Sequence, residues 1–168
     1  MLDRLLSDHE MIRQHAQGLL DLLACETMPS SLHLADARWK LGSKIMQHMA
    51  FEDRHLYAKL LRDERPHVRA IGLKFQSELT KLFSAYSEHA QFWTPERIAQ
   101  DWNGFRLASI RMTHAMFARL ALEEAELYPL ANDAAIDIAS NVPPDTNWTR
   151  EAFAIKDAIT HQPRGAAG

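Results

Sequence analysis

The chain has 168 residues, 46% of them hydrophobic, and its 19 basic and 22 acidic residues give a formal net charge of −3. This length and apolar content predict one domain with a sizeable core, and the mixing of both charge signs argues against a nucleic-acid or membrane surface. The single cysteine, Cys25, excludes an internal disulfide and a cysteine-based zinc site, as expected of a cytoplasmic protein.

Residues 2–25 repeat apolar side chains at helical spacing and predict the first helix. The first residues carry a charge every few positions, so we expect neither a signal peptide nor a membrane span here. His9 stands on the apolar seam of this helix. The other seam residues are Leu5, Ile12, Ala16, Leu19 and Leu23. A short break around Pro29 should turn the chain back, so that the second helix runs antiparallel to the first.

Residues 33–61 contain no proline and predict a second, long helix. His48, Glu52 and His55 are spaced i, i+4 and i+7 on it, so they should share one face. Leu41 and Ile45 continue this stripe, which predicts that the face is buried. Buried imidazole and carboxylate groups need partners, and a shared cation removes the cost of burying them. The stripe therefore predicts a metal site.

A third helix is predicted over residues 67–92, and Thr94 followed by Pro95 predicts the start of a fourth. The seam of the third helix is Ile71, Phe75, Leu79, Leu82, Tyr86 and His89. The fourth carries two apolar stripes, and Asn103-Gly104 can interrupt it. Glu123 interrupts the stripe of Trp102, Phe105, Met112, Met116 and Leu127. The other stripe is Leu107, Ile110, His114, Phe117, Ala121, Glu124 and Tyr128.

The C-terminal part predicts little independent structure. A Pro-rich linker follows Ser140, and residues 149–160 predict one short amphipathic helix, through Phe153, Ile155 and Ile159, on the outside of the bundle. Residues 162–168 should be disordered, because they have nothing to bury. The sequence thus predicts an all-α fold: an up-down antiparallel four-helix bundle over residues 1–133, then a linker, a short helix and a flexible tail over 134–168.

Antiparallel packing of the first two helices should place His9 beside His48 and Glu52. Imidazoles with carboxylates, and no thiolate, suit iron, manganese or zinc and do not suit copper(I) or an iron–sulfur cluster. Iron is the leading candidate on this chemistry.

The order of these motifs resembles the hemerythrin-like, or HHE cation-binding, domain family. The likeness rests on Asp8-His9, on the stretch from His48 to Tyr57, and on its echo from Glu123 to Pro129. It implies a non-haem iron centre, di-iron in similar family members. The ligands that it implies are His9, His48, Glu52 and Glu123. It also implies sensing or binding of oxygen or nitric oxide, iron handling, or repair of iron–sulfur centres. The expected partners are a metal ion and a diatomic small molecule.

Two residues depart from the family pattern, since Gln76 and Arg119 stand where histidines are expected. Arginine only donates hydrogen bonds, so Arg119 would repel a cation and could pair with Glu123 or Glu52 instead. His55 or His114 could restore the number of ligands in a mononuclear or shifted site. The alternative is a metal-free bundle acting as an interaction or structural module. No phosphate loop or nucleophile motif assigns an enzymatic activity.

Overall fold

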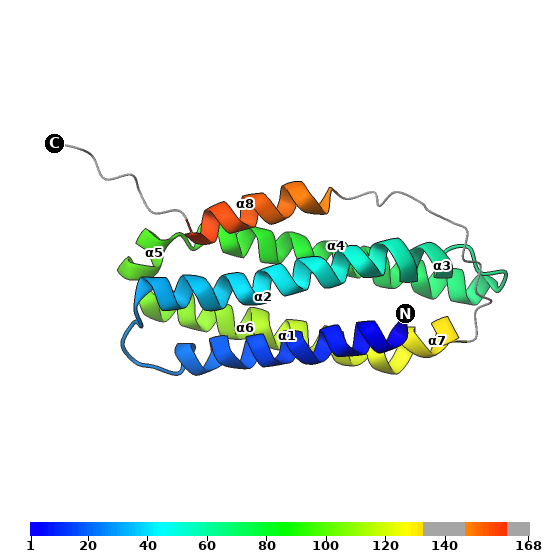
Figure 1. Ribbon diagram of the computed structural model, residues 1–168, viewed down its shortest axis with the longest axis horizontal. Coiled ribbons are helices and arrows are strands. Elements are labelled where there is room, and N and C mark those ends of the chain that lie inside the picture. The colour runs from blue at the N-terminus through cyan, green and yellow to red at the C-terminus, as the bar shows by residue number, and fades with distance from the viewer. Residues whose placement is uncertain (133–146, 161–168) are drawn as a thin grey trace.

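The computed structural model describes residues 1–132 and 147–160, and within these two ranges every regular element is a helix. The expected all-α class is confirmed for this part of the chain. Four long helices extend side by side along the longest axis of the molecule (Figure 1). They are α1 (Leu2–Leu23), α2 (Ser31–Phe51), α4 (Pro66–Phe92) and α6 (Trp102–Leu122). None of the helices that the structure describes is long and apolar enough to span a membrane.

Side-chain caps and prolines set the helix starts. Ser30 Oγ accepts a hydrogen bond from the backbone of His33 at the start of α2, and Pro66 occupies the first position of α4. The predicted fourth helix begins at Pro95 but is divided into α5 (Pro95–Gln100) and α6. Asp101 separates the two and accepts a hydrogen bond from the Gly104 backbone at 2.8 Å. The interruption expected at Asn103-Gly104 is therefore the N-cap of a new helix.

Two segments of π-helix follow the long helices α2 and α6. They are η1 (Glu52–Tyr57), which leads into α3 (Ala58–Leu60), and η2 (Glu123–Leu127), which leads into α7 (Tyr128–Asn132). A π-turn bonds residue i to i+5 and so contains more residues than an α-turn. Tyr57 and Tyr128, each five residues after a segment's first glutamate, are both buried. The same wider turn places His55 on the exposed side, so its expected place on the buried face is wrong.

The predicted seam of the first helix is confirmed, because all its residues, His9 included, are buried in α1. On α4, Phe75 and Leu79 are buried as expected, whereas Tyr86 and His89 are only half-buried. The buried face of α6 includes Phe105 and Met116 of the first expected stripe and no residue of the second. Its members are Phe105, Ser109, Thr113, Met116, Arg119 and Leu120.

Two residues placed on the stripes of α6, Leu107 and His114, are exposed. Small polar side chains occupy the buried face instead, and hydrogen bonds satisfy them. Thr113 donates to the Ser109 carbonyl at 2.8 Å, and the Ser109 hydroxyl pairs with a histidine of α4. An apolar pattern does not reveal buried hydroxyls of this kind.

The predicted C-terminal helix is present as α8 (Trp148–Thr160), which packs against α2 and α4. Ile155 and Ile159 are buried as expected. Phe153 is 62% exposed, so its expected place on the packed face is wrong. Most of the expected linker and the whole of the expected disordered tail lie outside the described residues.

Candidate metal centre

Four residues that the sequence predicted as metal ligands come together between the long helices. His9 lies on α1 and His48 on α2, while Glu52 and Glu123 are the first residues of η1 and η2. None of the four is more than 3% exposed. One potential ligand atom from each lies within 4.8 Å of those from the other three. The fold thus brings two imidazoles and two carboxyl groups together at one buried position, and we call these four residues the His/Glu cluster.

His9 turns its two ring nitrogens to different partners. Nδ1 lies 2.8 Å from Glu124 Oε1, and that carboxylate also pairs with Arg13 at 2.8 Å. A carboxylate only accepts, so we assign the proton to Nδ1. Nε2 faces the cluster, 3.1 Å from His48 Nε2 and 2.7 Å from the Tyr128 hydroxyl. An outer carboxylate that fixes the tautomer in this way is the usual support of a metal-binding histidine.

His48 has a similar surrounding on its outer side. Its Nδ1 lies 3.8 Å from Asp8 Oδ2, and the other oxygen of Asp8 accepts a hydrogen bond from Lys44 at 2.5 Å. Neither His48 Nδ1 nor Asp8 Oδ2 has a hydrogen-bond partner, although both are buried. Burial, followed by the charge of His9, lowers the pKa of His48 to about 3. The imidazole is therefore neutral at pH 7, as a metal ligand must be.

The contact between the His9 and His48 rings cannot satisfy the hydrogen-bonding nitrogens of both. If His48 donates from Nε2 to His9, its Nδ1 lone pair faces the Asp8 carboxylate. If the proton is on Nδ1 instead, two Nε2 lone pairs face each other across 3.1 Å. A cation between the Nε2 atoms removes both conflicts, and so does an additional proton on His9.

The two carboxyl groups differ in charge. Tyr128 donates a 3.0 Å hydrogen bond to Glu52 Oε1, but Glu52 Oε2 is buried without a partner. Burial, then the nearby charge of Glu123, raises the pKa of Glu52 well above its usual range. Burial alone would raise the pKa of Glu123 too, but the adjacent His9 ring and the charge and hydrogen bond of Arg119 outweigh it and lower that pKa. The negative charge of the pair therefore resides on Glu123.

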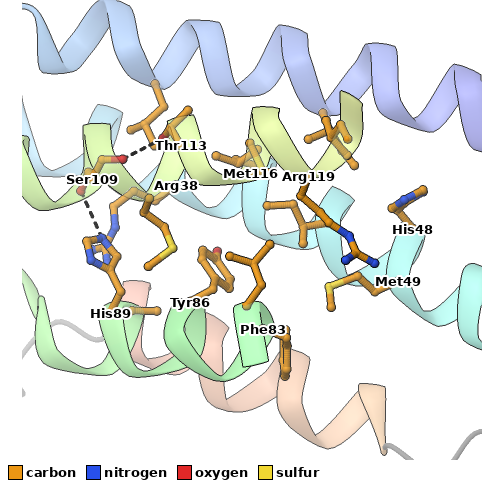
Figure 2. A pocket seen from close by; sticks show the side chains of 18 of the residues that line it. Arg38, His48, Met49, Phe83, Tyr86, His89, Ser109, Thr113, Met116 and Arg119 are labelled. Carbon is orange, nitrogen blue, oxygen red and sulfur yellow. Dashed lines mark hydrogen bonds between the residues drawn. The ribbon is translucent and has the colours of Figure 1, made fainter. Parts of the chain in front are cut away.

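Arg119 points into the core and is only 7% exposed. Its Nε donates to Glu123 Oε1 at 2.5 Å, so the pairing expected from the sequence is present. The guanidinium also donates to the Tyr57 hydroxyl and to the Phe75 carbonyl, both at 2.9 Å. Figure 2 shows its guanidinium at the end of a cavity where His48 and Met49 also lie. Arg119 thus occupies one side of the cluster but contacts one carboxylate of the two.

The residues considered as additional ligands lie elsewhere. His55 is exposed and packs on the Phe51 ring at 4.4 Å between centroids. His114 is exposed on α6. Gln76 donates to Asp53 at 3.1 Å and does not reach the cluster. Of the residues that the structure describes, none on α4 belongs to the group of potential ligands.

The sequence did not reveal the outer carboxylates Asp8 and Glu124, nor the roles of the two tyrosines. Tyr57 and Tyr128 are buried, and their hydroxyls bond to Arg119 and to Glu52. The available signal was the repeated spacing of a glutamate and a tyrosine five residues later. An α-helix would place such a pair on different faces. The two residues share a face only where the turn is a π-turn.

The chain was compared with models of protein families, with curated proteins and with solved structures, and none of these comparisons found a match.

Proposed function

We propose that the His/Glu cluster binds a metal ion, with iron as the first candidate, and that the chain is a metal-binding protein of the hemerythrin-like type. One observation carries this proposal: His9, His48, Glu52 and Glu123 converge within 4.8 Å while Glu52 Oε2 has no hydrogen-bond partner. Two imidazole nitrogens and two carboxylate oxygens suit iron, manganese and zinc. A cation there would satisfy the buried oxygen and separate the facing imidazoles.

The proposal includes the fold of that type, an up-down antiparallel four-helix bundle. Contacts support it because they join the beginning of one helix to the end of another. His9, early in α1, contacts His48, late in α2, and also Tyr128, which follows η2. His89, late in α4, bonds to Ser109, early in α6. Sites in such bundles are built from facing side chains in the core.

The number of donors favours one ion per chain. A di-iron bundle draws about six ligands from its four helices, whereas the group here has four members. The positions of the two missing histidines are taken by Gln76 and Arg119. A single ion with four protein ligands retains room for a small molecule. We therefore place the function in the binding or sensing of oxygen or nitric oxide, or in iron handling.

The contact between Arg119 and Glu123 favours a second candidate, a bundle that works without metal. In that state Arg119 and an additional proton on His9 would satisfy part of the cluster. The chain would then act as an interaction or structural module. This state leaves Glu52 Oε2 without a partner, which is why we place it second.

Elemental analysis and the visible absorption spectrum test the proposal on protein purified from iron-supplemented cells. We expect about one iron per chain, and we expect His48→Ala to lose it. His89→Ala is the matched control, because His89 is a partly buried histidine of the same bundle that bonds to Ser109, away from the cluster. His55→Ala, at an exposed site, is the second control. Equal loss from all three variants, or none from His48→Ala, overturns the site. Wild-type protein that takes up no added Fe²⁺, Mn²⁺ or Zn²⁺ supports the metal-free module.

A further inference from the structure

A second buried arginine, Arg38 of α2, has no counter-ion among the residues that the structure describes. Its side chain is 6% exposed, and its Nη2 atom is buried without a hydrogen-bond partner. It forms no ion pair within the described ranges, and its guanidinium carbon lies 5.2 Å from the centroid of the Phe105 ring. Burial lowers the pKa of Arg38 to about 10, so the group remains charged at pH 7. An unpaired buried cation is costly and calls for an explanation.

The other buried arginine shows what is missing. Arg119 pairs with Glu123 and donates to three further oxygens. Arg38, with similar burial, has none of these partners. Since the two lie in one protein core, the difference points to an anion that reaches Arg38 from outside the described residues.

Arg38 lines one end of a cavity between the helices. Arg38, His89 and Ser109 lie at that end, and His48 and Arg119 lie at the opposite end, beside the His/Glu cluster (Figure 2). The ten-residue separation of Arg38 and His48 on α2 corresponds to roughly 15 Å along the helix. The walls between the two ends are almost wholly apolar. They include Leu41, Ile45, Met49, Leu79, Phe83 and Met116.

Tyr86 supplies a second polar group at the Arg38 end. A Cβ atom on Gly42 would lie 2.4 Å from the Tyr86 hydroxyl, so the glycine makes room for it. Burial raises the pKa of Tyr86 to about 12, so the hydroxyl keeps its proton and can donate it. Burial, followed by the charge of Arg38, lowers the pKa of His89 to about 4, so that ring is neutral at pH 7. Arg38 is thus the one cation at this end among the described residues that line the cavity.

We propose that this cavity binds a monocarboxylate with an unbranched apolar chain, whose carboxylate lies on Arg38 and Tyr86 and whose chain extends along the apolar walls toward the His/Glu cluster. The planar guanidinium matches a carboxylate with two parallel hydrogen bonds. One uncompensated positive charge suits a monoanion better than a phosphate. The apolar walls would bury the chain, and the flexible methionines among them adapt to its shape. This inference does not depend on metal binding.

Calorimetric titration of the full chain with decanoate tests the proposal, with 1-decanol as the uncharged probe of similar length. We expect one decanoate per chain and at least tenfold weaker binding of decanol. Arg38→Met should weaken decanoate binding at least tenfold. Arg111→Met, which removes an exposed arginine of α6, should leave it unchanged. Decanol that binds as tightly as decanoate, Arg38→Met that keeps its affinity, or the absence of decanoate binding overturns the proposal.

Thermal unfolding without ligand separates binding from a structural role. If the Arg38 charge serves a ligand, Arg38→Met should unfold at the same temperature as the wild type or higher, because it removes an unpaired buried charge. A lower midpoint would show that Arg38 supports the fold and would overturn the assignment. Decanoate should raise the midpoint of the wild type and not that of Arg38→Met. The decanoate affinity of chelator-treated wild type should be retained, which separates this site from the metal proposal.

Discussion

The guanidinium of Arg119 and the carboxylate of Glu123 lie one helical turn apart, and Nε of the first donates to Oε1 of the second at 2.5 Å. Both side chains are almost fully buried. The carboxylate on which a metal would rely is therefore already held by a cation. Two of the predictions below follow from this pair.

Replacing Arg119 by Leu should make the stability of the protein depend on metal. The change leaves Glu123 buried without its cation, and breaking such a pair by removing one partner costs about 3–5 kcal/mol. A bound metal would take over the charge of Glu123 and restore most of this loss. Urea unfolding with chelator and with added Fe²⁺ measures both values. The same loss in both conditions would contradict a metal at the His/Glu cluster.

The two glutamates should respond differently to replacement by glutamine. Because the pKa of Glu52 is raised well above its usual range, Glu52→Gln exchanges one neutral group for another and should change the metal-free stability by less than about 1 kcal/mol. Glu123→Gln leaves Arg119 without its counter-ion and should cost about 3 kcal/mol. Chemical denaturation of the two variants in the presence of a chelator checks that Glu123→Gln is the less stable. Metal analysis should show that both variants lose the ion. Equal stabilities would refute the assigned charges.

The half-buried His89 should make the protein less stable in mild acid. Burial, then Arg38, lowers its pKa in the folded state to about 4, below the value of about 6.5 in an unfolded chain. The unfolded state therefore takes up the proton first as the pH falls, so stability present above pH 6.5 is lost toward pH 4. Between pH 7 and pH 5 this residue should account for about 2 kcal/mol of lost stability.

His89→Gln is the matched variant for this pH dependence, because glutamine does not titrate and can still bond to the Ser109 hydroxyl. Urea unfolding at pH 7 and pH 5 should show a smaller loss in the variant than in the wild type. The idea fails if both proteins lose the same amount.

Two glycines within helices should respond in opposite directions to alanine. A Cβ on Gly18 of α1 would meet nothing within 4 Å, so Gly18→Ala should stabilise the protein by roughly 0.5–1 kcal/mol through helix propensity. A Cβ on Gly42 of α2 would lie 2.4 Å from the Tyr86 hydroxyl. The displacement of that ring should outweigh the gain and cost about 1–2 kcal/mol. Thermal unfolding of both variants measures the contrast, and a stabilised Gly42→Ala would show that Tyr86 moves freely.

The sequence by itself determined the long helices and placed His9, His48 and Glu52 on their buried faces. The seam of α1 with His9 in it and the pairing of His48 with Glu52 one turn later follow from the helical period, which is a local property of the chain. The caps at Ser30 and Thr94 are local as well, since each side chain bonds to a backbone group three residues away. Features of this kind can be read without knowing what the helix packs against.

The tertiary structure alone decided how the cluster is completed. The period of an α-helix placed His55 beside Glu52, but the π-turns of η1 and η2 turn His55 outward and the two tyrosines inward. A π-turn is rare, so no local preference predicts it, and contacts across the core must stabilise it. Here those contacts include the bond from Tyr128 to Glu52, which joins residues 76 positions apart.

The partners of buried charges were decided in the same way. Asp8 and Lys44 are ordinary polar residues in the sequence, and only the antiparallel contact of α1 and α2 brings them to each other beside His48. Arg38 and Arg119 read alike as arginines on helices. Arg119 meets the carboxylate of Glu123, whereas Arg38 meets an apolar cavity. Charge pairing depends on distances between segments far apart in the chain, which helical periodicity does not encode.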